Sequence, residues 1–260
     1  MIINCDGNTS CRRRVLILIS VNFIWFDLGY TLVYMERETH YQQVLKDYNV
    51  EMSMEEITLA FHLADKFFMR EHPGVLGKKD GNCTEHYHRI LHGYLGIDVV
   101  PQLTNKLSSK QKQRPQWKAF DATIPVLQQL KEDGYGIGLI SNWDLTARDV
   151  LKETGILPYL DHVVVSSEVS IEKPDKRIFE YAMSQAGVLP EECLYVGDNY
   201  YDDVIGSRKV SMESVVINPF ASQGIEELTD VIVISNIKDL YTALPATKVL
   251  IGANNHDTNQ

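Results

Sequence analysis

Short apolar runs alternate with longer amphipathic segments over most of the chain beyond residue 117. Runs rich in β-branched and aromatic residues predict buried strands, whereas apolar positions three and four apart indicate helices. The predicted strands are 21–26, 136–140, 162–166, 193–196, 214–217 and 231–234. The predicted helices are 124–132, 145–153, 174–186, 202–209 and 237–244. This alternation predicts an α/β fold with a doubly wound parallel sheet.

The segment between the first predicted strand and residue 118 departs from that alternation, because its apolar positions follow helical spacing. The clearest helix runs from Glu55 to Glu71, and Ser53 with Glu56 forms a capping-box signature at its start. We therefore expect an inserted α-helical cap domain at 34–117. The α/β core domain would comprise 19–33 and 118–246, and the ends, 1–18 and 247–260, are expected to be flexible.

Polar residues follow the predicted strands where a parallel sheet places its ligand sites. Asp27 and Ser141 end two strands, Lys173 follows a third, and Asp198 with Asp203 follows a fourth. The carboxyl edges of such strands converge on one crevice. A carboxylate nucleophile, a hydroxyl donor, a lysine charge and oxygen ligands for magnesium together suit phosphoryl transfer.

In their order, these motifs resemble those of the haloacid dehalogenase-like hydrolases, in the subfamily with a helical cap inserted after the first strand. The family's first motif, Asp-x-Asp-x-Thr, reads here Asp27-Leu-Gly29-Tyr30-Thr31. Its second is a strand ending in Ser or Thr, here Ser141, and its third is a lysine, here Lys173 before proline. Its fourth is Gly-Asp followed by a further Asp, here 197–203. The resemblance implies a Rossmann-like core and covers roughly residues 21–244.

The resemblance also implies a role for each matching residue. Asp27 would attack phosphorus, while Ser141 and Lys173 would contact the phosphoryl oxygens. Mg²⁺ would be the cofactor, and its expected ligands are the Asp27 carboxylate, the Gly29 backbone carbonyl, Asp198 and Asp203. The residues expected on the substrate side are Thr31, which would also brace the motif loop, Asn142 and Trp143. The expected partner is a small phosphorylated metabolite.

Glycine at position 29 departs from the family pattern, because the family's general acid and base is an aspartate there. Losing such a group removes roughly 10²–10⁴-fold in rate. The chain could then be a slow phosphatase, use a leaving group that needs no proton, pass its phosphoryl group to another acceptor, or take a proton donor from the cap. A phosphate-ligand binder or regulatory protein without turnover is a further alternative.

A metal-independent 2-haloacid dehalogenase is another alternative, since those enzymes also lack the second aspartate. Two features count against it. Asp198 and Asp203 preserve a metal site that a dehalogenase does not need. The dehalogenases resemble Asp-x-Tyr-Gly-Thr at the first motif, whereas this chain has Gly29 before Tyr30.

Charge and composition indicate which classes of partner and which cellular location to expect. The formal net charge of −10 over 260 residues makes nucleic acid an unfavourable partner. The apolar run at 15–26, after Arg12 to Arg14, is too short to span a membrane, so no membrane partner is expected. Four cysteines without a CxxC pair predict reduced thiols and a cytoplasmic location. The sequence makes no prediction of oligomeric state.

Three histidines, at 86, 88 and 92, fall on the predicted helix 85–95. His88 and His92 would share a helix face, as zinc ligands can. No Glu lies between them in the metalloprotease pattern, so we expect a solvated face of the cap helix.

Overall fold

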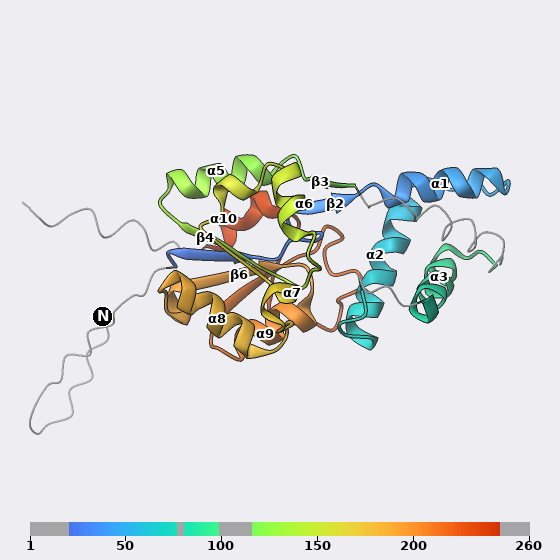
Figure 1. The fold of residues 1–260 in the computed structure, drawn as a ribbon. Coiled ribbons are helices and arrows are strands. Elements are labelled where there is room, and N and C mark those ends of the chain that lie inside the picture. The colour runs from blue at the N-terminus through green and yellow to red at the C-terminus, as the bar shows by residue number, and fades with distance from the viewer. Residues whose placement is uncertain (1–20, 77–80, 99–115, 245–260) are drawn as a thin grey trace, which may run out of the picture.

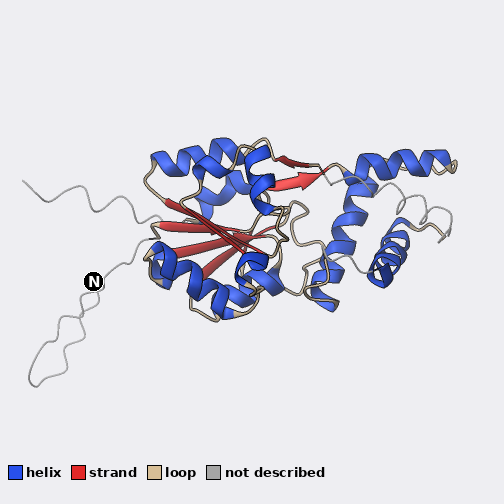
Figure 2. Ribbon diagram, in the orientation of Figure 1, coloured by secondary structure: helices blue, strands red, loops and turns tan. Residues whose placement is uncertain are grey.

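A computed structural model describes residues 21–76, 81–98 and 116–244, with a six-stranded parallel sheet at its centre (Figures 1 and 2). The strand order is β5-β4-β1-β6-β7-β8. Their bounds are β1 Phe23–Phe26, β4 Gly136–Ser141, β5 His162–Val165, β6 Cys193–Gly197, β7 Glu213–Ile217 and β8 Ile232–Ile234. The predicted doubly wound α/β fold is confirmed. All six predicted strands are present, within three residues at each end.

Helices cover both faces of the sheet (Figure 1). One face carries α5 (Thr123–Glu132), α6 (Ala147–Glu153) and α10 (Leu240–Ala243). The other carries α7 (Ser166–Val169), α8 (Lys176–Ala186) and α9 (Ile205–Arg208). Helix α8 ends at Gly187, whose φ of 65° is the left-handed conformation that glycine adopts without strain.

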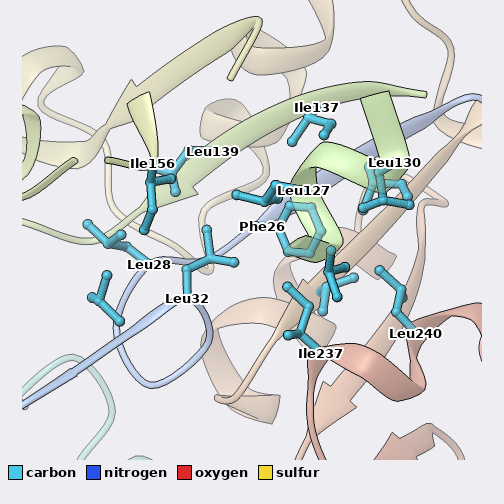
Figure 3. Close-up of a cluster of buried hydrophobic side chains, with 14 of the residues drawn as sticks. Phe26, Leu28, Leu32, Leu127, Leu130, Ile137, Leu139, Ile156, Ile237 and Leu240 are labelled. Carbon is cyan, nitrogen blue, oxygen red and sulfur yellow. The ribbon is translucent and has the colours of Figure 1, made fainter. Parts of the chain in front are cut away.

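Strand β1 supplies side chains to both layers of the core, because successive residues of a strand point to opposite faces. Ile24 and Phe26 pack under α5 and α6, where Figure 3 shows Phe26 among leucine and isoleucine side chains. Phe23 and Trp25 pack on the α8 side. All four are buried, so β1 is a buried strand, as the apolar run predicts.

The inserted helices lie beside one end of the sheet and form the cap (Figure 1). They are α1 (Arg37–Asp47), α2 (Met54–Glu71) and α3 (Gly81–Leu95). Their own buried cluster centres on Tyr41, Ile57, Phe61 and Leu91. The capping box at the start of α2 is confirmed, since Glu56 N donates to Ser53 Oγ at 3.2 Å and Ser53 N donates to Glu56 Oε2 at 2.8 Å.

Two short strands join cap and core: β2 (Val33–Met35) pairs antiparallel with β3 (Trp117–Ala119). They lie next to the predicted domain boundaries at 33/34 and 117/118, which stay a prediction. The predicted flexible ends, 1–18 and 247–260, lie outside the described residues. No helix within the described ranges is long and apolar enough to cross a membrane.

The structure differs from the prediction at 202–209. That stretch is not one regular helix but a turn of π-helix, η3 (Tyr200–Val204), followed by α9. Asn199 starts the turn, and its side chain accepts hydrogen bonds from Tyr201 N at 3.1 Å and Asp202 N at 3.3 Å. Such π-turns are rare and recur at functional sites. The strands β2 and β3 were also missed, because three residues carry too little periodicity to be detected.

Candidate active site

Asp27 stands at the carboxyl end of β1, in the middle of the sheet, with 9% of its surface exposed. Its Oδ1 accepts hydrogen bonds from Ser141 Oγ at 3.1 Å and from Lys173 Nζ at 2.7 Å. Ser141 ends the neighbouring strand β4, as predicted. The structure thus brings together the three residues expected to be catalytic.

Lys173 is 4% exposed, and its ammonium group reaches three acceptors. Besides Asp27, these are Asp203 Oδ1 at 2.7 Å and the Tyr195 hydroxyl at 2.9 Å. Burial alone would lower the pKa of Lys173, but the carboxylates of Asp203 and Asp27 outweigh it and hold that pKa well above its ordinary value. Lys173 is therefore a fixed positive charge beside the Asp27 carboxylate.

The backbone around Lys173 is held by Asn142. The Asn142 side chain donates to Lys173 O at 2.9 Å and accepts from Lys173 N at 2.8 Å. This pair of bonds ties the end of β4 to the loop that carries the lysine. Asn142 thereby positions Lys173, and its substrate-binding role stays a prediction.

Three aspartates follow β6. Asp198 lies at the end of that strand, beside β1. Burial raises the pKa of Asp198 to about 7, although the nearby Lys66 ammonium acts to lower it. Asp203 is 1% exposed and has a partner for each oxygen, Lys173 and the Asn199 backbone N–H at 3.0 Å. Burial also raises the pKa of Asp202 to about 7, and its buried Oδ1 has no hydrogen-bond partner among the described residues.

Glycine at 197 is required by the Asp203 carboxylate. A Cβ added at Gly197 would lie 2.1 Å from Asp203 Oδ2, far closer than two such atoms can approach. The glycine of the fourth motif therefore allows the π-turn to bring Asp203 against the strand end. Asp203 in turn holds Lys173 in place.

The donor set fits magnesium. Asp27 and Asp198 end adjacent strands and offer carboxylate oxygens, the ligand type that Mg²⁺ prefers. Asp198 is 9% exposed and its Oδ2 lies 3.6 Å from the Lys66 ammonium, so a bound dication would add compensation for a buried negative charge. No cluster of three or more His, Cys, Asp or Glu side chains in the described part of the chain could hold a metal alone. The predicted metal ligands therefore rest on the Asp27 and Asp198 carboxylates and the Gly29 carbonyl. Asp203 would act by holding Lys173 in place.

Gly29 lies under the indole of Trp143. A Cβ added at Gly29 would lie 3.2 Å from Trp143 Cζ3, tighter than ordinary van der Waals contact. The indole is fixed by Trp117, with ring centroids 4.7 Å apart, and by its Nε1, which donates to Thr146 Oγ1 at 3.2 Å. Trp143 thus packs against Trp117, and its Cζ3 crowds a side chain at 29; its substrate-binding role stays a prediction. Thr31, the last residue of this motif, is 2% exposed, and its hydroxyl lacks a partner among the described residues.

Lys66 of the cap helix α2 is the site residue that the sequence did not reveal. Its ammonium donates to the Asp198 carbonyl oxygen and lies 3.6 Å from Asp198 Oδ2, and the side chain is 5% exposed. The only signal in the sequence is a lysine in an amphipathic helix, which ordinarily faces solvent. Its burial depends on how the cap docks, which periodicity does not show.

Two of the three histidines of α3 are not solvated, so the expectation is wrong for His88 and His92, while His86 is partly exposed. His88 is 7% exposed and His92 is fully buried, because both pack inside the cap rather than on its surface. Burial, with a smaller contribution from His92, lowers the pKa of His88 to about 4. Their ring centroids are 6.2 Å apart, and neither belongs to a metal-type cluster in the described residues.

Fold and site together define a cap-bearing α/β hydrolase with its acidic residues at the carboxyl edge of the sheet. The chain belongs to the haloacid dehalogenase-like hydrolases, whose family model matches residues 24–217. The helical insertion between β1 and β4 agrees with the subfamily that the motifs resemble.

Two curated relatives are similar over most of their length. An uncharacterized hydrolase of Schizosaccharomyces pombe is 30% identical over 200 residues, 73% of this chain and 87% of that protein. A glyceraldehyde 3-phosphate phosphatase of Methanopyrus kandleri is 30% identical over 185 residues, 70% of this chain and 79% of that protein. Among solved structures, the magnesium-bound HAD-hydrolase YfnB of Bacillus subtilis has a TM-score of 0.58 at 17% identity, covering 86% of this chain and 99% of that one. At that identity the likeness concerns the fold.

Proposed function

We propose that this protein is a magnesium-dependent phosphatase of a small phosphorylated metabolite that forms an aspartyl-phosphate on Asp27. The observation that carries the proposal is the pairing at Asp27, whose carboxylate is buried between Ser141 Oγ at 3.1 Å and Lys173 Nζ at 2.7 Å. A carboxylate held by two donors at the edge of a parallel sheet is oriented to attack. A phosphatase among the relatives at 30% identity supports the same chemistry.

The first step would make an Asp27 Oδ–phosphorus bond and break the bond from phosphorus to the leaving oxygen. Lys173 and Ser141 would transfer their hydrogen bonds from Asp27 to the phosphoryl oxygens, where negative charge gathers. Asp203 and Asn142 would hold Lys173 in place for this. A bound Mg²⁺ would neutralise phosphoryl charge and help orient the group.

The second step would return Asp27 to its carboxylate. Water would attack phosphorus, and inorganic phosphate would leave. Gly29 supplies no base for that water and no acid for the first leaving group, and the Trp143 indole crowds the position next to it. We therefore expect slow breakdown of the aspartyl-phosphate and the best turnover on substrates whose leaving oxygen needs little protonation.

Hydrolysis of an aryl phosphate tests the proposal. We expect turnover with Mg²⁺, loss of turnover with EDTA, and a fall of about 10³-fold or more in kcat/KM for Asp27→Asn. Turnover that survives EDTA, or halide release from a 2-haloacid in the presence of EDTA, would contradict it. Ser141→Ala is the graded comparison. It removes one of the two donors to Asp27 and should cost about 10-fold to 100-fold.

A further inference from the structure

Among the described residues of the cap, Lys66 is the side chain that contacts the acidic edge of the site. The proposed chemistry assigns it no role. Both oxygen contacts of its ammonium are on Asp198, the carbonyl oxygen and Oδ2 at 3.6 Å. The remaining neighbour within hydrogen-bond range is the Met69 sulfur at 3.7 Å, a weak acceptor. A buried ammonium with such partners is incompletely neutralised, and it would gain from an anion.

The loop of the core that contains Gly224 packs against the aliphatic part of the Lys66 side chain. Gly224 has a φ of 78°, and a Cβ there would lie 3.0 Å from Lys66 Cβ and 3.1 Å from Cγ. The loop can therefore close on the lysine stem only because residue 224 is glycine. This close fit places the first carbons of the Lys66 side chain against the core.

Three residues of α2, spaced four apart, make the cap seam, the contact between this helix and the core. His62 Nε2 lies 3.0 Å from Gln223 O, Lys66 contacts Asp198, and Arg70 Nη1 lies 3.3 Å from Glu227 Oε1. Residues four apart share one helix face, so the seam is a single stripe. Lys66 occupies its centre and is the residue of the stripe that reaches the site.

The charges around Asp198 indicate what Lys66 is for. A divalent cation held by Asp27 and Asp198 would share the Asp198 carboxylate with the ammonium, and the two cations would repel each other. A phosphate group adjacent to both would add the missing negative charge. It would then receive Lys173 from the core and Lys66 from the cap.

We infer that Lys66 is a substrate-binding residue supplied by the cap, whose ammonium contacts the phosphate of the substrate and rests on Asp198 when no phosphate is bound. This inference rests on the proposed phosphatase function. It makes phosphate the ligand that stabilises the cap seam. A divalent cation alone would weaken the hold of Lys66 on Asp198 and loosen the cap seam.

The test is calorimetric binding of inorganic phosphate to the full chain in the presence of Mg²⁺. Lys66→Met keeps the stem and removes the charge, and it should weaken phosphate binding by about 10-fold to 100-fold, as expected for one charge-assisted hydrogen bond. The same variant should bind Mg²⁺ alone severalfold more tightly, because a competing cation is gone. Arg70→Met is the matched control, since it removes an ion pair of the cap seam outside the site. It should leave phosphate affinity within about twofold.

Each outcome decides one claim. If the wild type binds no phosphate with Mg²⁺, the proposed phosphatase function is contradicted. If the wild type binds and Lys66→Met binds equally well, or Arg70→Met loses as much affinity, only the role of Lys66 is overturned. Should Lys66→Met fail to fold, Lys66→Gln serves instead, since it can still donate to the Asp198 carbonyl but carries no charge.

Discussion

Restoring an aspartate at position 29 probes the most unusual feature of this site. Gly29→Asp would reintroduce a carboxyl two residues after Asp27, but its Cβ would meet Trp143 Cζ3 at 3.2 Å. The indole cannot yield freely, because Trp117 packs against it at 4.7 Å between ring centroids and Thr146 accepts its N–H. Overpacking of this kind costs about 1–3 kcal/mol.

That cost sets the expected rates. A placed general acid is worth roughly 10²–10⁴-fold. A penalty of about 1–3 kcal/mol removes roughly 5-fold to 150-fold of it, since about 1.4 kcal/mol is a factor of ten. We therefore expect the gain in kcat/KM from Gly29→Asp alone, on an alkyl phosphate, to be roughly 5-fold to 150-fold smaller than the gain from the same change where the indole is absent. In a Trp143→Leu background, which opens the space, the same change should raise kcat/KM by about 100-fold or more.

The assay compares an alkyl with an aryl phosphate in four proteins: wild type, each single variant and the double variant. The gain should be smaller on the aryl phosphate, because a phenolate leaves with little protonation. A full gain from Gly29→Asp alone would refute the claim that Trp143 blocks this position. No gain in the double variant would refute the claim that a side chain at 29 can deliver a proton.

Two further predictions concern stability. Lys173→Met leaves the carboxylates of Asp27 and Asp203 buried without their shared cation, so the free energy of unfolding measured in urea should fall by about 3–5 kcal/mol; a fall below about 1 kcal/mol would contradict the pairing. Burial, with the nearby His92, lowers the pKa of His88 to about 4, against about 6.5 when unfolded, so the unfolded chain binds more protons between these values. The contribution of His88 to the free energy of unfolding should therefore be complete above pH 6.5 and decline towards pH 4, with about 1–2 kcal/mol lost at pH 5. His88→Leu should flatten this dependence of stability on pH.

The sequence predicted the core and the strand-end residues because both depend on local signals. Short apolar runs identified the six strands, and parallel strands necessarily bring their carboxyl ends to one edge. Asp27, Ser141 and Lys173 therefore lie together as expected. The capping box at Ser53 is equally local, and it too is confirmed.

What the sequence could not predict depends on contacts between distant segments. Lys66 reaches Asp198 across 132 positions of the chain, and only the docked cap shows it. Trp143 covers Gly29 because two separate loops meet, and the burial of His88 and His92 follows from how the cap helices pack on one another. The π-turn at 200–204 has no periodic signature, although the Asn199 that starts it is a typical capping residue.

The central claim, that Asp27 becomes phosphorylated, is tested most directly by acid-quenching the enzyme during turnover of an aryl phosphate with Mg²⁺ and weighing its peptides. Because Gly29 offers no base for the second step, the intermediate should accumulate. The peptide that contains Asp27 should then carry the mass of one phosphoryl group, and Asp27→Asn should abolish it. Turnover without that adduct, or an adduct on another residue, would contradict the account.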